Sequence, residues 1–216
     1  MTMGRAATVQ KMIEVGVVPI VRVNSEEVAL RVCEAVLEAG VKTIEVTFTV
    51  PRAARVIETL RDRYPELMVG AGTVHDAAAA RQAVDAGAQY ILSAGLVPEV
   101  ISTGHLYGLP VVPGVFTATE AIRALQLGAD ILKLFPASLG GPKYLKALRA
   151  PMPQATWCPT GGVALENLHE WARAGAAMIG VGSPLLQDVA ETGDYQGLTR
   201  RAKQFLEGWH AARQQA

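Results

Sequence analysis

Eight short runs of apolar, often β-branched residues alternate along the chain with segments of helical periodicity. Continuous apolar strands separated by helices are typical of a parallel sheet that is covered on both faces. Eight such units favour an α/β fold of the closed (β/α)8 type, a TIM barrel, over an open doubly wound sheet. The expected strands are residues 16–23, 41–48, 67–72, 88–94, 109–115, 129–135, 155–162 and 176–183.

A helix-ending glycine recurs before every second expected strand. The four positions are Gly40, Gly87, Gly128 and Gly175, each where a left-handed residue closes a helix. The repeating unit is therefore βαβα used four times, which divides an eight-stranded barrel evenly. Because 216 residues lie near the lower end for this fold, we expect a single domain over residues 1–216, with an extra N-terminal helix.

The charges exclude several classes of function. The chain has 20 Lys and Arg residues and 20 Asp and Glu residues, so its formal net charge is zero and gives no basic footprint for nucleic acid. No window approaches the roughly 18 uncharged apolar residues of a membrane helix, and the N-terminal segment lacks a signal-peptide core. We expect a cytoplasmic protein that binds neither nucleic acid nor membranes.

The cysteines and histidines form no metal-binding pattern. Cys33 and Cys158 stand in apolar contexts and are predicted to be buried free thiols. The histidines lack ligand spacing and are predicted to lie at the surface; they are His75, His105, His169 and His210. A dinucleotide-binding fingerprint is missing too, so we expect no cofactor and no metal.

Lys133 is the only polar residue in the apolar run 131–135. An ammonium group taken out of water without a partner costs several kcal/mol, so this lysine needs a specific reason for its place. Strand alternation puts Lys133 on one face with Ile131 and Phe135, while Leu132 and Leu134 share the other. Since the leucines suit the helix layer, Lys133 is predicted to point into the barrel lumen.

Two further charged residues are predicted to share this lumen. In the second strand, Glu45 alternates with apolar neighbours and turns inward with Thr43 and Thr47. Arg22 lies late in the first strand. A Lys133–Glu45 ion pair could merely fill the barrel, but buried ion pairs contribute little stability. The alternative is an amine that attacks a carbonyl carbon to give a Schiff base, with Glu45 as the proton carrier.

Glycines follow the last two expected strands, as "TGG" at 160–162 and "GVGS" at 180–183. In barrels of this type, phosphate often binds after these two strands, where glycines let backbone amides approach the anion. The alternative is that they are only tight turns. Thr73, after the third strand, is a candidate hydroxyl donor to a substrate.

Five segments carry a family resemblance: "IEVTF", "VGAGTV", "VVPGVFTATE", "ILKLFPA" and "CPTGGV". Together they resemble the class I 2-keto-3-deoxy-6-phosphogluconate (KDPG) aldolases, whose family includes 4-hydroxy-2-oxoglutarate (KHG) and 6-phosphogalactonate aldolases. The matches run in order through nearly the whole chain. The resemblance implies a metal-free lyase, commonly a homotrimer, that acts on a phosphorylated keto acid, as in the Entner–Doudoroff pathway.

The resemblance also implies roles for individual residues. Lys133 matches the lysine that forms a Schiff base with pyruvate, and Glu45 matches the general acid/base that acts through an ordered water. The other implied substrate contacts are Thr73 and Thr160 near the pyruvate moiety, Phe135 and Pro136 as a wall beside the lysine, and Gly161, Gly162, Gly182 and Ser183 at the phosphate end.

Two segments depart from the family pattern. Many members read "EVTLRT", where the arginine reaches the pyruvate carboxylate, but this chain reads "EVTFTVP". Thr49 therefore stands in the arginine's position, and Arg22 becomes the candidate for the carboxylate. Where members often read "SPG", this chain has Ser93, Ala94 and Gly95.

We therefore expect a Schiff-base aldolase that cleaves KDPG reversibly to pyruvate and glyceraldehyde 3-phosphate. The alternatives within the family are KHG and 2-keto-3-deoxy-6-phosphogalactonate (KDPGal) as substrates. A more distant alternative is an isomerase or epimerase that uses Glu45 as a base and Lys133 only for its charge. The last is a non-catalytic module that binds a phosphate ligand.

Overall fold

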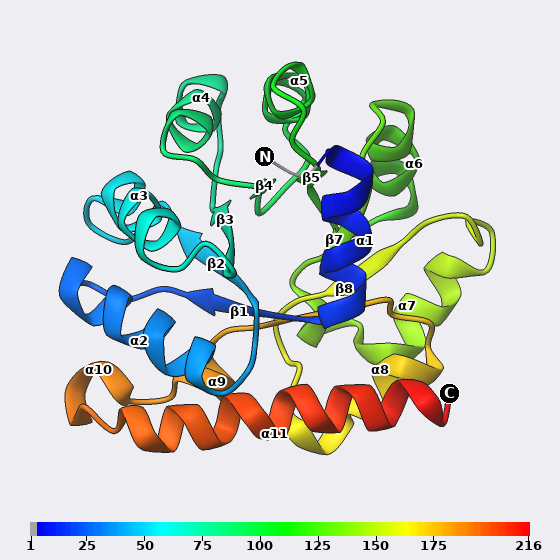
Figure 1. The fold of residues 1–216 in the computed structure, drawn as a ribbon. Coiled ribbons are helices and arrows are strands. Elements are labelled where there is room, and N and C mark those ends of the chain that lie inside the picture. Colours follow the sequence, from blue (N-terminus) through cyan, green and yellow to red (C-terminus); the bar gives the residue numbers. More distant parts are fainter. Residues whose placement is uncertain (1–3) are drawn as a thin grey trace.

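Short parallel strands alternate with helices over residues 4–216, the part of the chain that the computed structural model describes (Figure 1). Each expected strand range contains a strand, and the fifth contains two, because Pro113 has no N–H to donate and interrupts the ladder there. The strands are β1 (Val17–Val21), β2 (Thr43–Thr47), β3 (Met68–Gly72), β4 (Tyr90–Leu92), β5 (Val111–Val112), β6 (Gly114–Val115), β7 (Leu132–Leu134), β8 (Trp157–Pro159) and β9 (Ile179–Val181).

The helices lie outside the strands, and each of the four repeated glycines follows the end of a helix and precedes the next strand. The helices are α1 (Arg5–Val15), α2 (Glu26–Glu38), α3 (Ala53–Arg63), α4 (Ala77–Asp85), α5 (Pro98–Leu106), α6 (Ala118–Gln126), α7 (Gly141–Arg149), α8 (Leu168–Arg173), α9 (Ser183–Leu186), α10 (Val189–Thr192) and α11 (Tyr195–Gln214), with short 3-10 turns η1 (Ala137–Leu139) and η2 (Leu165–Asn167). Gly40, Gly87, Gly128 and Gly175 all have φ between 81° and 90°, so their predicted left-handed conformation is confirmed.

The strands form a six-stranded sheet in the order β5-β4-β3-β2-β1-β9 and a three-stranded sheet in the order β6-β7-β8. Two connections join the sheets. Pro113 alone separates β5 from β6, and a parallel bridge between Thr160 and Gly180 links the end of β8 to β9. Curling the sheet in this way brings the carboxyl ends of distant strands to one face.

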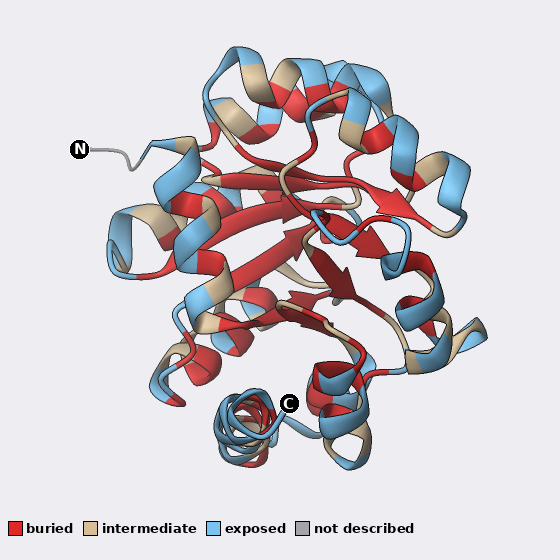
Figure 2. Cartoon of the chain, turned by 90° about the vertical axis from the view of Figure 1, so that its right-hand side faces the viewer, coloured by how far each residue is buried: buried red, intermediate tan, exposed pale blue. Residues whose placement is uncertain are grey.

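Two apolar cores lie on opposite sides of the strands. The larger one packs the outward strand residues against the helices, so the helices are buried on their inner faces and exposed on their outer faces (Figure 2). The smaller one fills the lumen and contains Tyr90, Ile131, Cys158 and Met178. Helix α1, dark blue in Figure 1, lies across the strands and adds Met12 to this lumen core.

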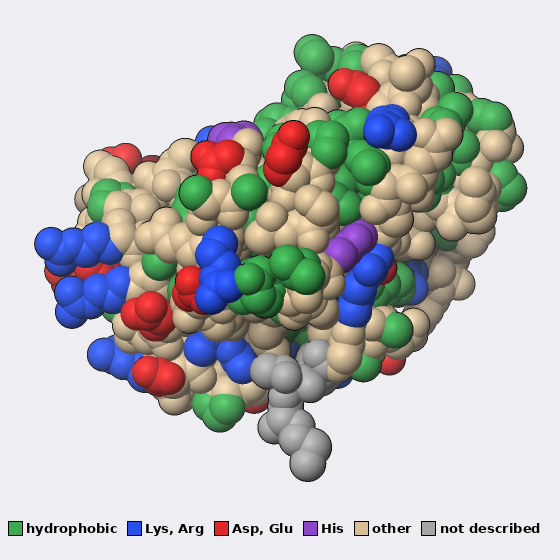
Figure 3. All heavy atoms as spheres, turned by 90° about the horizontal axis from the view of Figure 1, so that it is seen from above, with side chains coloured by type: hydrophobic (Ala, Val, Ile, Leu, Met, Phe, Trp, Pro, Cys, Tyr) green, Lys and Arg blue, Asp and Glu red, His purple; other side chains and the backbone are tan. Residues whose placement is uncertain are grey.

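The surface bears on several of the sequence predictions. Acidic and basic side chains are interspersed on the face shown in Figure 3. Among the described residues, no helix combines the length and apolar character needed to cross a membrane. Cys33 and Cys158 are buried free thiols, as predicted. The surface prediction was wrong for His105, whose side chain is 18% exposed because it packs beside Asp130, its Nε2 lying 3.7 Å from Oδ2.

Candidate active site

Lys133 and Glu45 meet inside the lumen, as strand alternation predicts. Lys133 is the central residue of β7 and Glu45 that of β2, and they are 5% and 1% exposed. Lys133 Nζ lies 3.7 Å from Glu45 Oε1. This separation allows electrostatic attraction but exceeds a hydrogen bond, and neither Glu45 oxygen accepts a hydrogen bond from the described protein groups. The carboxylate therefore has acceptor capacity free for a reacting proton.

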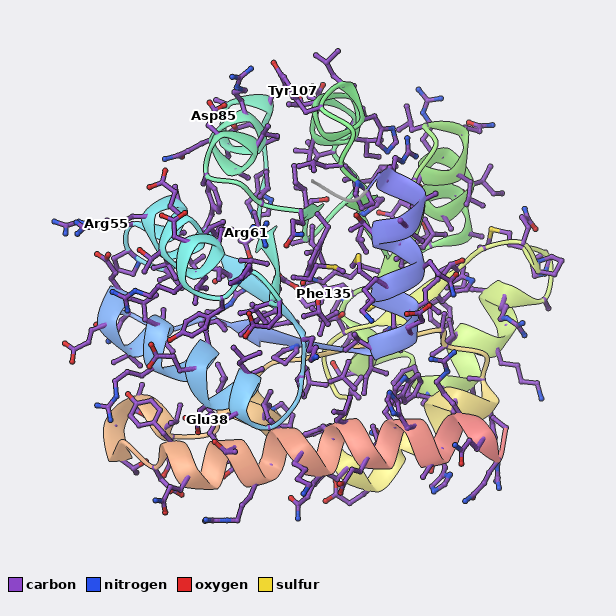
Figure 4. All side chains as sticks on the ribbon, viewed as in Figure 1. Glu38, Arg55, Arg61, Asp85, Tyr107 and Phe135 are labelled. Atoms are coloured by element: carbon purple, nitrogen blue, oxygen red, sulfur yellow. The ribbon has the colours of Figure 1, made fainter. Side chains whose placement is uncertain are left out.

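Apolar and weakly polar groups surround the Lys133 amine. The Phe135 ring centroid lies 5.4 Å from Nζ, and Figure 4 shows Phe135 near the centre of the molecule, inside the ring of helices. Cys158 is the partner of Lys133 in the β7–β8 register. Burial raises the pKa of the Cys158 thiol to about 12, although the lysine charge and a contact with Thr160 act in the opposite direction. The thiol therefore stays protonated and does not compete as a nucleophile at neutral pH.

A cavity of about 470 Å³ opens above Lys133 at the carboxyl ends of the strands, where active sites of such folds lie. Its charged lining residues are Arg22 and Lys133. The full lining is Ile20, Arg22, Thr73, Ala94, Lys133, Phe135, Thr160, Gly161, Gly162, Val163, Gly180, Gly182, Ser183 and Pro184. The structure thus brings the predicted substrate contacts into one cavity, except Thr49 and Pro136, which do not line it.

Arg22 and Thr73 form one end of this cavity. Arg22 Nη2 donates a hydrogen bond of 3.1 Å to Thr73 Oγ1. Thr73 has a φ of 59°, a left-handed conformation that is unfavourable for a β-branched residue. Such strained residues cluster at functional sites, where the surrounding structure holds them in place. Here the strained turn directs a hydroxyl and a guanidinium at the cavity.

Thr49 faces a different cavity. It lines a neighbouring space of about 400 Å³ together with Arg22, Asn24, Gln187 and Glu191. Thr49 Oγ1 lies 2.7 Å from Thr47 Oγ1, which donates to the Val21 carbonyl. Thr49 is therefore linked through Thr47 to the end of β1, outside the Lys133 cavity. Arg22 lines both cavities.

Glycine backbone forms another part of the cavity wall. Gly161 and Gly162 have φ values of 85° and 79°, and a Cβ on Gly162 would lie 2.8 Å from Ser138 Cβ. Both positions therefore require glycine. Gly140 and Gly141, by contrast, lie at the start of α7 and do not line the cavity.

Sequence reasoning missed several parts of the site. Ile20, Gly180 and Pro184 also line the cavity, and alternation back from Arg22 was the available signal for Ile20. Gly180 belongs to the quoted "GVGS" segment but was given no role of its own, although a Cβ there would lie 2.4 Å from Thr160 Oγ1. No signal in a single sequence pointed to Gly72, whose missing side chain leaves room for Glu45. Among residues 4–216, no group of three or more His, Cys, Asp or Glu residues could hold a metal ion.

Comparisons with known proteins agree with this geometry. The family model "KDPG and KHG aldolase" matches residues 9–201. The 2-dehydro-3-deoxy-phosphogluconate aldolase of Treponema pallidum is 36% identical over 89% of this chain and 93% of its own. The 2-dehydro-3-deoxy-6-phosphogalactonate aldolase of Escherichia coli is 38% identical over 78% and 83%. A KDPG aldolase from Legionella pneumophila, solved with pyruvate captured as a covalent carbinolamine, superposes with a TM-score of 0.81 at 31% identity, over 87% of this chain and 92% of its own.

Proposed function

Because this chain belongs to the KDPG and KHG aldolase family and is therefore a lyase, we propose that it cleaves KDPG reversibly through a Schiff base on Lys133. The products are pyruvate and glyceraldehyde 3-phosphate. The observation that carries the proposal is the buried Lys133 amine, 3.7 Å from the Glu45 carboxylate, in a cavity that Arg22 and several glycines also line.

The first stage forms the Schiff base. The neutral Lys133 amine donates its electron pair to C2 of the substrate. The nitrogen then loses one proton and the former carbonyl oxygen gains one through a water molecule and Glu45, which gives a carbinolamine with a hydroxyl on C2. Glu45 supplies protons through a water molecule as this hydroxyl leaves as water, which gives an iminium ion. Its buried carboxylate, without a protein hydrogen-bond donor, is free to exchange protons at each step.

The second stage breaks the carbon chain. Glu45, through water, takes the proton of the C4 hydroxyl, and the C3–C4 bond breaks as C4 becomes an aldehyde. The electron pair of that bond moves into C3=C2 and neutralises the iminium nitrogen, so the other product is an enamine. Protonation of the enamine at C3 regenerates the iminium. Water then adds to C2, pyruvate leaves, and Lys133 becomes a free amine again.

Arg22 and Thr73 are proposed to bind the carboxylate next to C2, with Thr160 also beside the pyruvate moiety. A guanidinium presents donors in a fork that matches a carboxylate, and the hydrogen bond to Thr73 turns Arg22 toward the catalytic cavity. Arg22 thus takes the place of the family arginine that Thr49 replaces.

Gly161, Gly162, Gly182 and Ser183 are proposed to hold the phosphate through backbone amides and a hydroxyl. The left-handed glycines support this role because they allow close approach of an anion to the backbone. KHG, whose aldehyde half has no phosphate, is the main alternative substrate. KDPGal is a second candidate, favoured by the 38% identity to the E. coli phosphogalactonate enzyme.

We also propose that residues 1–216 form one closed (β/α)8 domain with α1 as an additional helix. The single residue between β5 and β6 and the Thr160–Gly180 bridge support closure. From the family resemblance, the protein is proposed to be a cytoplasmic homotrimer of the Entner–Doudoroff pathway.

The test is to incubate the protein with pyruvate and borohydride and to locate the reduced adduct by mass spectrometry. The expected adduct is on Lys133, with none on the Lys133→Arg variant or on the surface residue Lys143. An isomerase or epimerase would give no adduct, and a binding module would give neither adduct nor turnover. Comparing kcat/KM for KDPG, KDPGal and KHG then identifies the substrate.

A further inference from the structure

The lumen face of β3 carries no side chain at its two positions nearest the active site. Val69 and Ala71 point into the helix-facing core, so alternation leaves Gly70 and Gly72 facing the lumen. Neither glycine is among those with positive φ, so an alanine could adopt the same backbone. What matters at these two positions is the space that a Cβ would occupy.

Tyr90 from β4 fills the space over Gly70. A Cβ on Gly70 would lie 2.2 Å from the Tyr90 ring. The ring is fully buried, and its hydroxyl donates a 2.7 Å hydrogen bond to the carbonyl of Ile44, the residue before Glu45. This contact ties β4 to β2 across β3, directly below the acidic side chain.

Glu45 from β2 fills the space over Gly72. In the β2–β3 register, Glu45 lies opposite Gly70, and Thr47 lies opposite Gly72. The Glu45 side chain therefore leans toward the carboxyl end of the barrel, where a Cβ on Gly72 would lie 1.9 Å from Oε1 and 2.4 Å from Cδ. No real Cβ contact is so short, so a methyl group there would displace the carboxylate.

The packing of neighbouring residues sets the position of the Glu45 carboxylate, because no protein hydrogen bond holds it. Neither oxygen is bonded to a described protein donor, and the ionic neighbour Lys133 is 3.7 Å away. A buried carboxylate with such loose polar contacts takes the rotamer that the surrounding packing leaves open. At the top of β3, the open space is the one over Gly72.

We infer that Gly72 is a positioning residue for the proposed reaction: its bare Cα holds the Glu45 carboxylate where it can exchange protons with the Lys133 adduct. The inference rests on the proposed role of Glu45 as general acid/base. Gly72 touches no reacting atom. Its replacement should therefore impair proton transfer but leave Lys133 able to bind pyruvate covalently.

The test compares two readouts in the full chain. The first is exchange of the pyruvate methyl hydrogens for deuterium, followed by NMR, which needs a proton carrier at C3. The second is the amount of pyruvate trapped on Lys133 by borohydride after long incubation. Gly72→Ala is expected to slow exchange about a hundredfold, the scale of a lost general acid/base, while trapping reaches the wild-type amount. Gly95→Ala is the matched control, because a Cβ there meets nothing within 4 Å, and it should change neither readout.

A double-mutant cycle with Glu45→Ala separates positioning from damage to the fold. Alanine at position 45 has no atom beyond Cβ, so it removes Oε1, Cδ and Cγ, the three Glu45 atoms that lie within 2.5 Å of a Cβ at position 72. The Glu45→Ala/Gly72→Ala variant should therefore exchange at the rate of Glu45→Ala alone and melt at the same temperature, even if Gly72→Ala alone fails to fold.

The results have distinct meanings. If Gly72→Ala exchanges like Gly95→Ala, or if the double variant shows the product of the two single losses, the inference about Gly72 is overturned. Glu45→Gln is run in parallel to test the proposed function. Full exchange by Glu45→Gln refutes the acid/base role itself, whereas loss of exchange in Glu45→Gln with full exchange in Gly72→Ala refutes only the positioning role.

Discussion

Arg22 and Thr73 are joined by a 3.1 Å hydrogen bond from Nη2 to Oγ1, although they follow β1 and β3, with β2 between these strands in the sheet. The bond links a positive charge to the strained residue Thr73. Both side chains line the cavity that Lys133 also lines, which is the basis for the proposed carboxylate site.

Arg22→Gln is expected to raise KM for the keto acid substrate. A hydrogen bond to a charged group is worth about 1.5–3 kcal/mol, so kcat/KM should fall about ten- to a hundredfold. Steady-state kinetics with KDPG or pyruvate exchange measure this. Arg55→Gln serves as the control, because it removes an ion pair between the exposed Arg55 of α3 and Glu26 of α2. Equal KM values for the two variants would contradict carboxylate binding by Arg22.

Gly162→Ala is expected to impair phosphorylated substrates selectively. Its Cβ would press on Ser138, and the left-handed backbone disfavours alanine by about 1–2 kcal/mol. The kcat/KM ratio of KDPG to KHG should fall about tenfold, on the scale of one lost backbone hydrogen bond to an anion. Gly141→Ala is the matched control, because Gly141 also has a positive φ of 66° but lies at the start of α7 with open space around its Cβ. Equal losses on both substrates would refute the phosphate assignment.

Cys158 is predicted to make the fold less stable at alkaline pH. Its pKa is raised from 9.0 to about 12 by burial. Between these values the folded state binds more protons than the unfolded state, so stability is lost as pH rises above about 9. In urea denaturation, the free energy of unfolding should decline less from pH 8 to pH 10.5 for Cys158→Ala than for the wild type. Cys33→Ala, which removes the other buried thiol, should also flatten the decline, and parallel curves for all three proteins would contradict the prediction.

His105 is predicted to destabilise the fold at acidic pH. Burial and then the nearby Arg5 lower the pKa of His105 below its usual 6.5, against the opposing effect of Asp130. As pH falls through 6.5, the unfolded chain takes up a proton that the folded chain does not, so stability is lost. His105→Gln should lose less stability between pH 7.5 and pH 5.5 in denaturant titrations. His75→Gln, at an exposed position, should follow the wild type.

Local sequence pattern determined the inward direction of the two central residues. In a strand, successive side chains point to opposite faces. With Leu132 and Leu134 facing the helices, Lys133 had to face the lumen, and Glu45 between Ile44 and Val46 had to do the same. The helix-ending glycines were equally local, because a left-handed closing residue follows from chain geometry alone. These features depend on neighbours in the sequence, so the sequence by itself sufficed for them.

Only the tertiary structure decided how far the side chains lean and which cavity each one reaches. The 3.7 Å contact of Lys133 with Glu45 and the separate cavity of Thr49 depend on strand register and on the curling of the sheet. The partial burial of His105 beside Asp130 depends on how α5 packs. The space over Gly72 is occupied by the side chain of Glu45, whose partner in the strand register is Gly70, two positions before Gly72. Such contacts join residues that are distant in sequence, and a one-dimensional pattern does not encode their distances.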